Sequence, residues 1–307
     1  MDTVNVELFG KDPKVQRAVS IARNISVTKA SVLIVGETGV GKKTLAQFIH
    51  QNSNRASKAF EVVDCSLEPQ MVENIIFGHR EEGRFNRGAL ESANGGTIVF
   101  ENIDCLEDSF QKKLHKVINE LTDYEIDVRI IATTSKNLSK LVGAGRFYRG
   151  LFIQVSSNNI VIPPLRERIS DLESLAKHFV SKLSDGEVEA SPEAIDRILG
   201  HYWSQNVDEL KRVIENSIGP CESNILDDIN LNVGEKKTAN PIFDEESESF
   251  KLMSLKEAEK LLIRKALVHT SENRTQAAKI LGVSIRTLRN KINEYRTEGA
   301  SYFVNLR

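Results

Sequence analysis

A glycine-rich loop carries the residues whose types and spacing best fit a chemical role. It reads Gly36-Glu37-Thr38-Gly39-Val40-Gly41-Lys42 and lies between a short apolar run and a helical pattern. Glycines let backbone N–H groups close around phosphate oxygens, the helix N-terminus adds a positive dipole, and the lysine brings charge to the β and γ phosphates. The spacing predicts a P-loop that binds ATP or ADP, and the flanking strand and helix disfavour a chance turn. The predicted binding residues are Gly36, Glu37, Thr38, Gly39, Val40, Gly41, Lys42, Lys43 and Thr44.

One position departs from the P-loop pattern. Lys43 stands where a Ser or Thr would ligate Mg²⁺, and Thr44 follows one place too late. The sequence therefore leaves open how the loop handles magnesium.

The loop must be positioned by a strand before it and a helix after it. Apolar, β-branched runs that predict buried strands lie at residues 31–35, 97–100 and 128–132. Helical patterns lie at residues 44–50, 109–121 and 192–217. The alternation of strands and helices predicts a parallel α/β sheet, and the last helical segment predicts a small α lid.

Composition and charge indicate a soluble protein with more than one domain. At roughly 100–200 residues per domain, 307 residues with 40% hydrophobic content should hold two or three domains. The formal net charge is only −2, but residues 251–296 hold 11 Lys and Arg against 4 Asp and Glu. The tail is therefore basic and the first 250 residues are acidic, which indicates a tail that faces double-stranded DNA.

Cysteine usage and hydropathy predict a cytoplasmic protein. Cys65, Cys105 and Cys221 are an odd number of cysteines without metal-ligand spacing, which fits a reducing compartment better than a disulfide framework. No apolar run approaches the roughly 18 residues that span a bilayer, and the N-terminus lacks the regions of a signal peptide. We expect no membrane contact and no metal site.

Four segments of the chain resemble the central AAA+ domain of the σ54 enhancer-binding proteins. They occur in the order of that family and with similar spacing, and a tryptophan segment at 203–210 and a Fis-like helix-turn-helix follow them. The resemblance spans nearly the whole chain. It implies an α/β AAA+ P-loop domain with a small α-helical lid, followed by an all-α Fis-like helix-turn-helix domain. The four segments are Gly36 to Lys42, Phe77-Gly78-His79, Gly95 to Phe100 and Pro163 to Arg168.

The resemblance and the composition together divide the chain into parts. Glu7-Leu8-Phe9-Gly10 already resemble the start of an AAA+ domain, so we expect no N-terminal receiver domain of the kind such regulators carry. The sequence is then either a piece of a longer chain or a naturally short protein. The expected parts are a nucleotide-binding α/β subdomain at 1–165, a helical lid at 166–220, a flexible acidic linker at 221–250 and the helix-turn-helix domain at 251–307.

The loop with which the family contacts σ54 is missing. Members of the family use ATP hydrolysis in a hexameric ring to remodel σ54 polymerase, through a surface loop with the sequence GAFTGA. In this chain Phe77-Gly78-His79 leads through Arg80-Glu81-Glu82 directly to Gly83-Arg84-Phe85. We interpret the σ54-contacting hairpin as deleted and predict a regulator that is independent of σ54.

The residues that the family uses for hydrolysis are replaced at four positions. The family's Walker B segment ends in Asp-Glu, whereas this chain has Glu101 and Asn102, and an amide cannot act as a general base. Two arginines that reach the neighbour's nucleotide in the family fall on Tyr148 and Gln154, and the sensor arginine of the lid falls on Asp208. Losing an arginine finger costs on the order of 10³ to 10⁵ in rate. We therefore predict a degenerate ATPase site that binds nucleotide without turnover, in a protein that is not an enzyme.

The resemblance then implies a nucleotide fold used as a switch or as an assembly surface. Such a regulator activates transcription with the housekeeping RNA polymerase by direct contact, or represses it by occupying the promoter. Some loopless relatives respond to cyclic di-GMP, which we keep as a candidate ligand, although Gln47 replaces the arginine that follows the P-loop in one of them. Arginines that could meet an anionic ligand, but that are more often simply solvated, are Arg80, Arg84, Arg87, Arg146 and Arg149.

The basic tail predicts a helix-turn-helix that reads DNA. Helices are expected at 257–269, 275–281 and 285–295, with Gly282-Val283-Ser284 as the sharp turn and Ser284 as a helix cap. The expected core residues are Ala277, Ala278, Leu281, Val283 and Leu288. Side chains at the start of the last helix can reach base edges in the major groove, and Fis-like tails pair as dimers on palindromic sites. The predicted DNA-binding residues are Ser284, Arg286, Thr287, Arg289, Asn290 and Lys291, with Arg274, Lys279 and Arg296 assigned to phosphates.

Two other functions stay open from the sequence. An active ATPase that remodels a polymerase partner would release phosphate well above background in the presence of DNA. A nucleoid-organising DNA binder with an inert AAA+ scaffold would show little sequence preference at fixed salt. For the leading hypothesis, a sequence-specific regulator, the expected partners are promoter DNA, RNA polymerase and further copies of the chain, as a homodimer or higher homo-oligomer.

Overall fold

The structure, a computed structural model, describes two compact units, Met1–Thr238 and Ala239–Arg307. The residues described are 10–81, 84–218, 224–227, 231, 259, 262–263, 266–267, 270 and 273–297. Among these residues, no helix is long and apolar enough to cross a membrane. Each unit is considered by itself below.

A parallel five-stranded sheet forms the centre of the first unit, in the order β2-β5-β6-β1-β7. The strands are β1 (Val32–Val35), β2 (Phe60–Asp64), β5 (Thr97–Glu101), β6 (Arg129–Thr134) and β7 (Asn158–Val161). The sheet predicted from the apolar runs is thus confirmed. Because β1 lies between β6 and β7, the glycine-rich loop leaves the carboxyl edge at an interior strand, where ligands of open α/β sheets bind.

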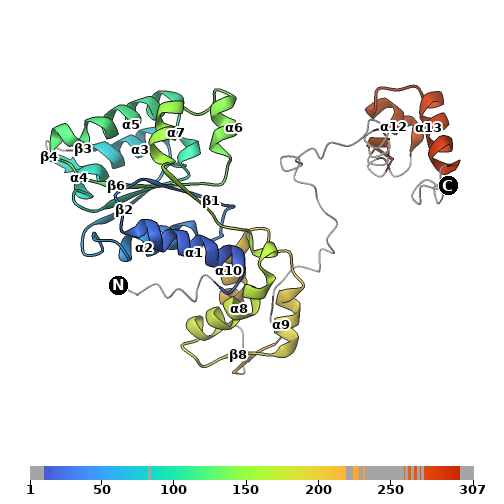
Figure 1. The fold of residues 1–307 in the computed structure, drawn as a ribbon. Helices are drawn as coiled ribbons and strands as arrows, with labels where there is room; N and C mark the ends of the chain where they lie inside the picture. Colours follow the sequence, from blue (N-terminus) through green and yellow to red (C-terminus); the bar gives the residue numbers. More distant parts are fainter. Residues whose placement is uncertain are drawn as a thin grey trace. The chain divides into compact units, whose positions relative to one another are not determined.

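Helices cover both faces of this sheet (Figure 1). Val32 and Ile34 of β1 pack toward one face with α1 and α2, whereas Leu33 packs toward the other with α3, α5 and α7. This alternation follows from the period of two along a strand. The helices are α1 (Pro13–Ser26), α2 (Lys42–Gln51), α3 (Pro69–Phe77), α4 (Ala89–Ser92), α5 (Asp108–Glu120), α6 (Leu138–Gly143) and α7 (Arg149–Val155), with short 3₁₀ turns η2 (Ile103–Cys105) and η3 (Leu121–Tyr124).

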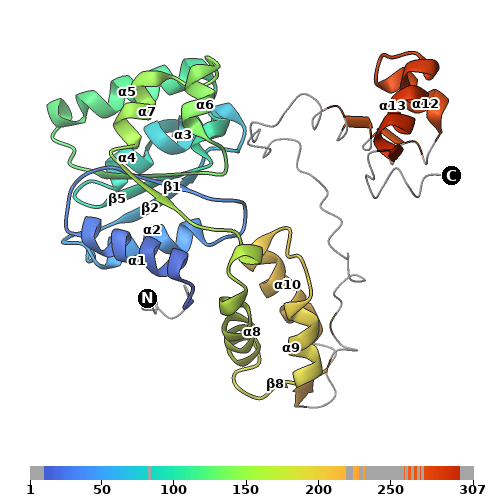
Figure 2. The ribbon, with the colours of Figure 1, turned by 45° about the vertical axis from the view of Figure 1, so that its right-hand side comes forward.

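A small helical lid follows the sheet (Figure 2). Trp203 is fully buried at its centre, and its indole N–H donates to the carbonyl oxygen of Ile198 at 2.9 Å. A buried tryptophan needs such a partner for its N–H, which fixes the ring in the core. The lid consists of η4 (Leu165–Glu167), α8 (Ile169–Leu183), β8 (Glu189–Ala190), α9 (Pro192–Leu199), α10 (Asn206–Ile218) and β9 (Ile225–Leu226).

The start of the predicted acidic linker belongs to the lid. Residues 221–250 were expected to be flexible, but Ile225–Leu226 form β9, which pairs in parallel with β8. Leu226 and Leu231 are buried in the lid core, because these apolar side chains gain more from burial than a solvated linker offers. Residues 221–223, 228–230 and 232–250 of the predicted linker lie outside the described residues.

A short hairpin is present where the sequence was interpreted as having lost one. Strands β3 (Gly78–Glu81) and β4 (Arg84–Arg87) pair in an antiparallel register that joins Gly78 to Arg87 and Glu81 to Arg84. Backbone hydrogen bonds join the two strands, although the segment lacks the alternation of apolar and polar residues that would have predicted them. Only two residues separate β3 from β4, which is too few for a long surface loop.

The second unit contains the expected helix-turn-helix. Helices α12 (Arg274–Ile280) and α13 (Ile285–Thr297) are joined at Gly282, whose φ of +66° favours glycine. The Ser284 hydroxyl accepts a hydrogen bond from the backbone N–H of Thr287 at 3.0 Å, which confirms its capping role. Val283 is 40% exposed and is not a core residue, because it lies in the turn. Of the predicted helix 257–269, the described residues 259, 262, 263, 266 and 267 are all helical.

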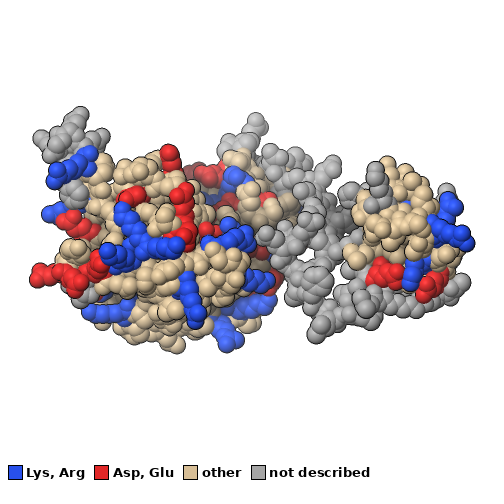
Figure 3. All heavy atoms as spheres, turned by 90° about the horizontal axis from the view of Figure 1, so that it is seen from above, with Lys and Arg blue, Asp and Glu red and all other residues tan. Residues whose placement is uncertain are grey.

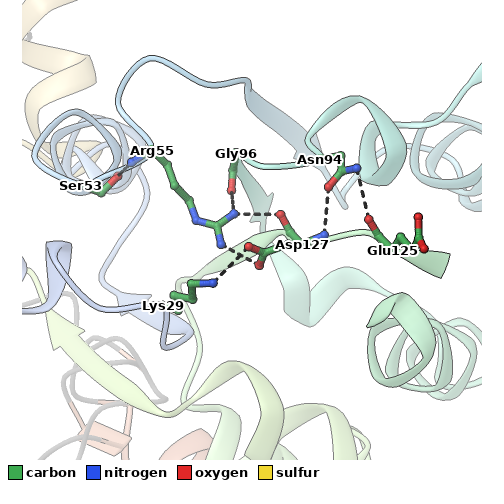
Figure 4. A network of polar contacts seen from close by, with 7 residues as sticks. All are labelled: Lys29, Ser53, Arg55, Asn94, Gly96, Glu125 and Asp127. Carbon is green, nitrogen blue, oxygen red and sulfur yellow. Dashed lines mark hydrogen bonds and ion pairs between the residues drawn. The ribbon is translucent and has the colours of Figure 1, made fainter. Parts of the chain in front are cut away.

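A buried arginine joins the amino ends of two central strands to the segment after α2 (Figure 4). Arg55 donates to the carbonyl oxygens of Gly96 at 2.9 Å and Asp127 at 2.8 Å, and to the Asp127 carboxylate at 2.7 Å. Lys29 reaches the same carboxylate from solvent at 3.2 Å, with its side chain 80% exposed. The two cations therefore share one carboxylate in very different surroundings.

We predict that Arg55→Met lowers the free energy of unfolding by about 1.5–3 kcal/mol, because it removes the charged hydrogen bonds to the Gly96 and Asp127 carbonyl oxygens, although each oxygen keeps a backbone donor. Lys29→Met, the matched control on the same carboxylate, should change it by less than about 1 kcal/mol, since exposed ion pairs contribute little. Urea unfolding of the two variants measures both effects. Equal losses would show that the carbonyl bonds of Arg55 do not matter.

Candidate functional site

The glycine-rich loop takes the backbone shape that phosphate binding requires. Gly39 and Gly41 have φ values of +79° and +100°, which side-chain-bearing residues rarely adopt. A Cβ added at Gly39 would lie 2.0 Å from the carbonyl oxygen of Gln205, whereas one at Gly41 would meet nothing within 4 Å. The loop is thus closed on the lid side and open where α2 begins.

The Lys42 ammonium lies folded over this loop. It donates to the carbonyl oxygens of Gly36 at 2.7 Å and Glu37 at 2.9 Å. Burial lowers the pKa of Lys42, and the negative charges of nearby carboxylates, Asp104 and Glu101 foremost, oppose that shift. The position and the acidic surroundings of Lys42 fit a cation that an incoming phosphate would meet.

Lid residues hold the loop from its other side. Arg166 donates two hydrogen bonds to the Glu37 carboxylate, at 2.7 and 2.5 Å. The amide of the fully buried Asn206 donates to Glu37 at 3.2 Å and to the carbonyl oxygen of Thr38 at 2.9 Å, and its oxygen accepts from the N–H of Leu165. We call Glu37, Arg166 and Asn206 the lid clamp.

Backbone contacts extend the lid clamp along the loop. The N–H groups of Val207 and Asp208, at the start of α10, point to the carbonyl oxygen of Gly39 at 2.9 and 3.3 Å. The buried Arg168 donates to the carbonyl oxygen of Val40 at 3.0 Å. The shape of the loop and the position of the lid are therefore set together.

The residues in the Walker B position lie at the carboxyl ends of β2 and β5. Glu101 and Asp64 are register partners on these strands, and the amide of Asn102 donates to the Asp64 carboxylate at 3.1 Å. Burial, together with the Asp64 charge, raises the pKa of Glu101, while Lys43 and Lys42 oppose the rise. For Asp64 burial also acts upward, but hydrogen bonds from Ser66 and Asn102 and the charge of Lys43 lower its pKa overall.

Tyr148 and Gln154, where the resemblance expects two arginines, both contact α5 of the same chain. Gln154 forms hydrogen bonds with His115 at 3.0 Å and with Asn119 at 2.9 Å, both on α5. The Tyr148 ring packs edge-on against His115 with centroids 5.4 Å apart. Asp208, in the place of the sensor arginine, is exposed, and its negative charge acts on Lys42.

The predicted residues of the loop and of the first turn of α2 are thus brought together. Lys43 is exposed and Thr44 is half-buried. Among the described residues, no group of three or more His, Cys, Asp or Glu side chains could hold a metal ion. On the face drawn in Figure 3, Lys and Arg side chains are interspersed with Asp and Glu.

The predicted DNA-binding residues separate into two groups in the second unit. Arg286, Thr287, Arg289 and Asn290 are exposed on α13, opposite its buried residues. Lys291 lies apart, because its ammonium donates to the Glu259 carboxylate at 2.9 Å, which also accepts from the Tyr295 hydroxyl. Ser284 acts through its cap, and the side chain of Lys279 lies outside the described residues.

Sequence reasoning missed Arg166, Asn206 and Asp64 as site residues. Arg166 and Asn206 lie within segments that carry the family resemblance, but the residues next to them do not predict their contacts with the loop. Asp64 could have been found, because it ends an apolar run and the ends of parallel strands meet at one edge.

The lid clamp should respond to pH. The hydrogen bonds from Arg166 lower the pKa of Glu37 despite partial burial. A lowered carboxyl pKa adds stability that is present above the ordinary range of a glutamate and is lost as the pH falls through the lowered value. We predict that the difference in unfolding free energy between the wild type and Glu37→Gln shrinks from about pH 7 to about pH 3.

Urea unfolding at both pH values measures this difference. The control is Glu167→Gln, whose ion pair with Lys14 is exposed on both sides and should contribute little at either pH. A Glu37→Gln difference that stays constant with pH would contradict a role for the charged pair.

Three family descriptions match the chain. Residues 8–161 match the Sigma-54 interaction domain, residues 166–241 the AAA+ ATPase lid domain, and residues 254–295 the Bacterial regulatory protein, Fis family.

Named relatives align along nearly the whole chain. The transcriptional regulatory protein FlbD of Caulobacter vibrioides is 32% identical over 320 residues, which cover 94% of this chain and 70% of the relative. The regulatory protein AtoC of Escherichia coli is 33% identical over 90% of this chain and 65% of its own length. The nitrogen fixation protein AnfA of Azotobacter vinelandii is 33% identical over 96% and 58%. The chain therefore spans roughly two thirds of the length of these relatives.

Solved structures show the same fold. NtrX from Brucella abortus, crystallised in complex with ADP, superimposes with a TM-score of 0.66 at 23% identity, over 94% of this chain and 69% of NtrX. RuvB from Thermotoga maritima gives 0.53 at 14% identity, over 95% and 89%. The predicted fold class, a P-loop AAA+ domain with a lid and a Fis-type helix-turn-helix, is confirmed. The chain belongs to the family of sigma54-dependent transcriptional regulators with a DNA-binding helix-turn-helix.

Proposed function

We propose that this protein is a sequence-specific transcription regulator whose AAA+ domain binds ATP or ADP and does not hydrolyse it. The observation that carries the proposal is the state of the replaced catalytic positions. Asn102 bonds to Asp64, and Gln154 bonds to His115 and Asn119, so that each side chain is committed within its own subunit. A site without a Walker B base and without arginine fingers retains the means to bind phosphate and lacks the means to cleave it.

Nucleotide binding itself is supported by the geometry of the loop. The space beside Gly41 is open, Gly41 caps the N-terminus of α2 without a side-chain hydrogen bond, and the Lys42 ammonium lies over the same loop. NtrX, which shares the fold, was crystallised with ADP and with ATP. Bound nucleotide would stabilise the loop, and the lid clamp would pass that effect to the lid.

The proposal extends to how the regulator works. The shortened β3–β4 hairpin supports regulation without the GAFTGA loop, so the regulator would contact the housekeeping RNA polymerase directly or occupy a promoter. Paired helix-turn-helix tails would place two recognition helices about one DNA turn apart on a palindromic site. Cyclic di-GMP stays a candidate ligand because Arg80, Arg146 and Arg149 are exposed, while the side chain of Arg84 lies outside the described residues.

Phosphate release tests the proposal. We predict that the wild-type protein, with ATP and DNA, releases phosphate no faster than Lys42→Ala, because the loss of arginine fingers alone slows turnover by on the order of 10³ to 10⁵. Calorimetric titration of the same protein with ATP, ADP and cyclic di-GMP should show binding of at least one of them. Release well above the Lys42→Ala background would overturn the proposal.

One observation favours the second candidate, an active ATPase. The Asp64 carboxylate lies beside Asn102 at the edge of the sheet, and its lowered pKa keeps it charged, so it could serve as a general base. Asp64→Asn separates the two candidates. If the wild type turns over ATP and this variant does not, Asp64 has replaced the missing glutamate; under our proposal both proteins stay at background.

DNA reading by α13 gives a separate prediction. Arg289→Ala should weaken binding to a selected high-affinity site by about 1–3 kcal/mol and binding to random DNA far less, if the guanidinium contacts a base. Lys291→Ala is the control, because its ammonium is already bonded to Glu259, and it should leave the ratio of specific to random affinity unchanged. Both are measured at one salt concentration by fluorescence anisotropy. Equal losses on both DNAs would make Arg289 a phosphate contact.

A further inference from the structure

Two successive lysines open α2, and they have different environments. Lys42 is half-buried and bonded to the loop carbonyl oxygens of Gly36 and Glu37. Lys43 is exposed, and its charge acts on two carboxylates. It opposes the rise that burial causes in the pKa of Glu101, and it helps to lower the pKa of Asp64. Lys43 is the second residue of α2, directly after the loop that leaves the carboxyl edge of β1, so its ammonium brings positive charge beside the loop.

The residues at this edge do not fit magnesium, the ion that P-loop sites of this fold use. Magnesium demands an octahedral set of oxygen ligands. An ammonium has no lone pair to offer, and it repels a divalent cation. Thr44 cannot replace the missing hydroxyl in place, because one residue along a helix turns a side chain by about 100°.

Two of the carboxylates at the edge already make contacts within the chain. Asn102 donates to Asp64, and the Asp104 carboxylate accepts from the Thr134 hydroxyl at 2.6 Å and pairs with Lys136 at 3.2 Å. In the part of the chain that the structure describes, no group of three or more His, Cys, Asp or Glu side chains could hold a metal ion. An ion at Asp64 or Asp104 would have to displace contacts that the chain makes with itself.

Fixed cations of the chain act on the carboxylates around the loop. Arg166 pairs with Glu37 and Lys136 pairs with Asp104. The charges of Lys42 and Lys43 act on Glu101, and the charge of Lys43 also acts on Asp64, while the charge of Asp208 acts on Lys42. In the family pattern, by contrast, a neutral hydroxyl stands at the Lys43 position, and the ion supplies the positive charge.

We propose that the Lys43 ammonium takes the place of magnesium in this site, so that the protein binds a nucleoside diphosphate or triphosphate free of metal. The inference rests on the proposed nucleotide binding. Because the ammonium is part of the chain, the fraction of protein with bound nucleotide depends on the nucleotide concentration and not on the magnesium concentration.

Calorimetric titration of the full chain with ADP, in MgCl₂ and in EDTA, tests the inference. ADP avoids any complication from turnover. The wild-type dissociation constant should agree within about twofold between the two buffers. Lys43→Thr, which returns the hydroxyl, should bind about tenfold more weakly in EDTA and regain affinity in MgCl₂.

Two further variants serve as controls. Lys43→Arg keeps the charge and should keep binding in EDTA, whereas Lys116→Thr removes an exposed lysine from α5 and should bind like the wild type in both buffers. Thermal unfolding shows whether each variant is folded. If Lys43→Thr does not fold, the comparison of the wild type with Lys43→Arg in EDTA tests the inference.

The outcomes separate the two levels of the proposal. Wild-type binding that weakens more than about tenfold in EDTA would overturn the inference and leave nucleotide binding intact. Lys43→Thr that binds as well as the wild type in EDTA would also overturn it. Absence of ADP and ATP binding in either buffer would remove nucleotide binding itself, and the role of Lys43 with it.

Discussion

Two parallel hydrogen bonds from the Arg166 guanidinium to the Glu37 carboxylate set the geometry on which the rest of the first unit depends. Planar, bidentate pairs of this kind fix an orientation as well as a distance. Asn206 completes the arrangement from a fully buried position, where an amide that lost its partners would carry a large cost. The phosphate loop is thus shaped by residues that follow it by more than a hundred positions, and a change in either part must reach the other.

The replaced catalytic residues form contacts of their own. Asn102 satisfies the Asp64 carboxylate, and it does so from a left-handed backbone conformation, with φ of +54°, that asparagine tolerates better than most residues. Gln154 is likewise bonded on both sides. The polar groups at these positions are therefore paired within the chain, which fits the binding role that we propose.

Sequence reasoning predicted the features that local pattern determines. The strand before the loop, the loop itself and the cap at Ser284 each follow from neighbouring residues, and all three are present. Strand β7 (Asn158–Val161) escaped prediction, because an edge strand is buried on fewer sides and two of its residues are asparagines. The lid clamp was missed for a different reason. Its residues are distant in sequence, and only the packing of the lid on the sheet brings them together.

Other errors came from reading composition as structure. The acidic stretch after the lid was expected to be linker from its beginning, but two leucines within it, Leu226 and Leu231, have a core to enter. The grouping of Lys291 with its basic neighbours on α13 stays a prediction, but composition did not show that its ammonium pairs with Glu259. Its pairing with Glu259 depends on a register between helices that no local pattern encodes.

The cluster of His115, Asn119 and Gln154 has a consequence for the chemistry of its face. The Gln154 amide nitrogen donates to Asn119, so its oxygen must receive the proton of His115 Nδ1, and the Asn119 amide then donates to Nε2. The three side chains close a ring of hydrogen bonds that selects a single imidazole tautomer, protonated on Nδ1. The ring ties α5 to α7 through three side chains that each take part in two of its three hydrogen bonds, so a substitution at any one of them would leave a single bond of the ring in place.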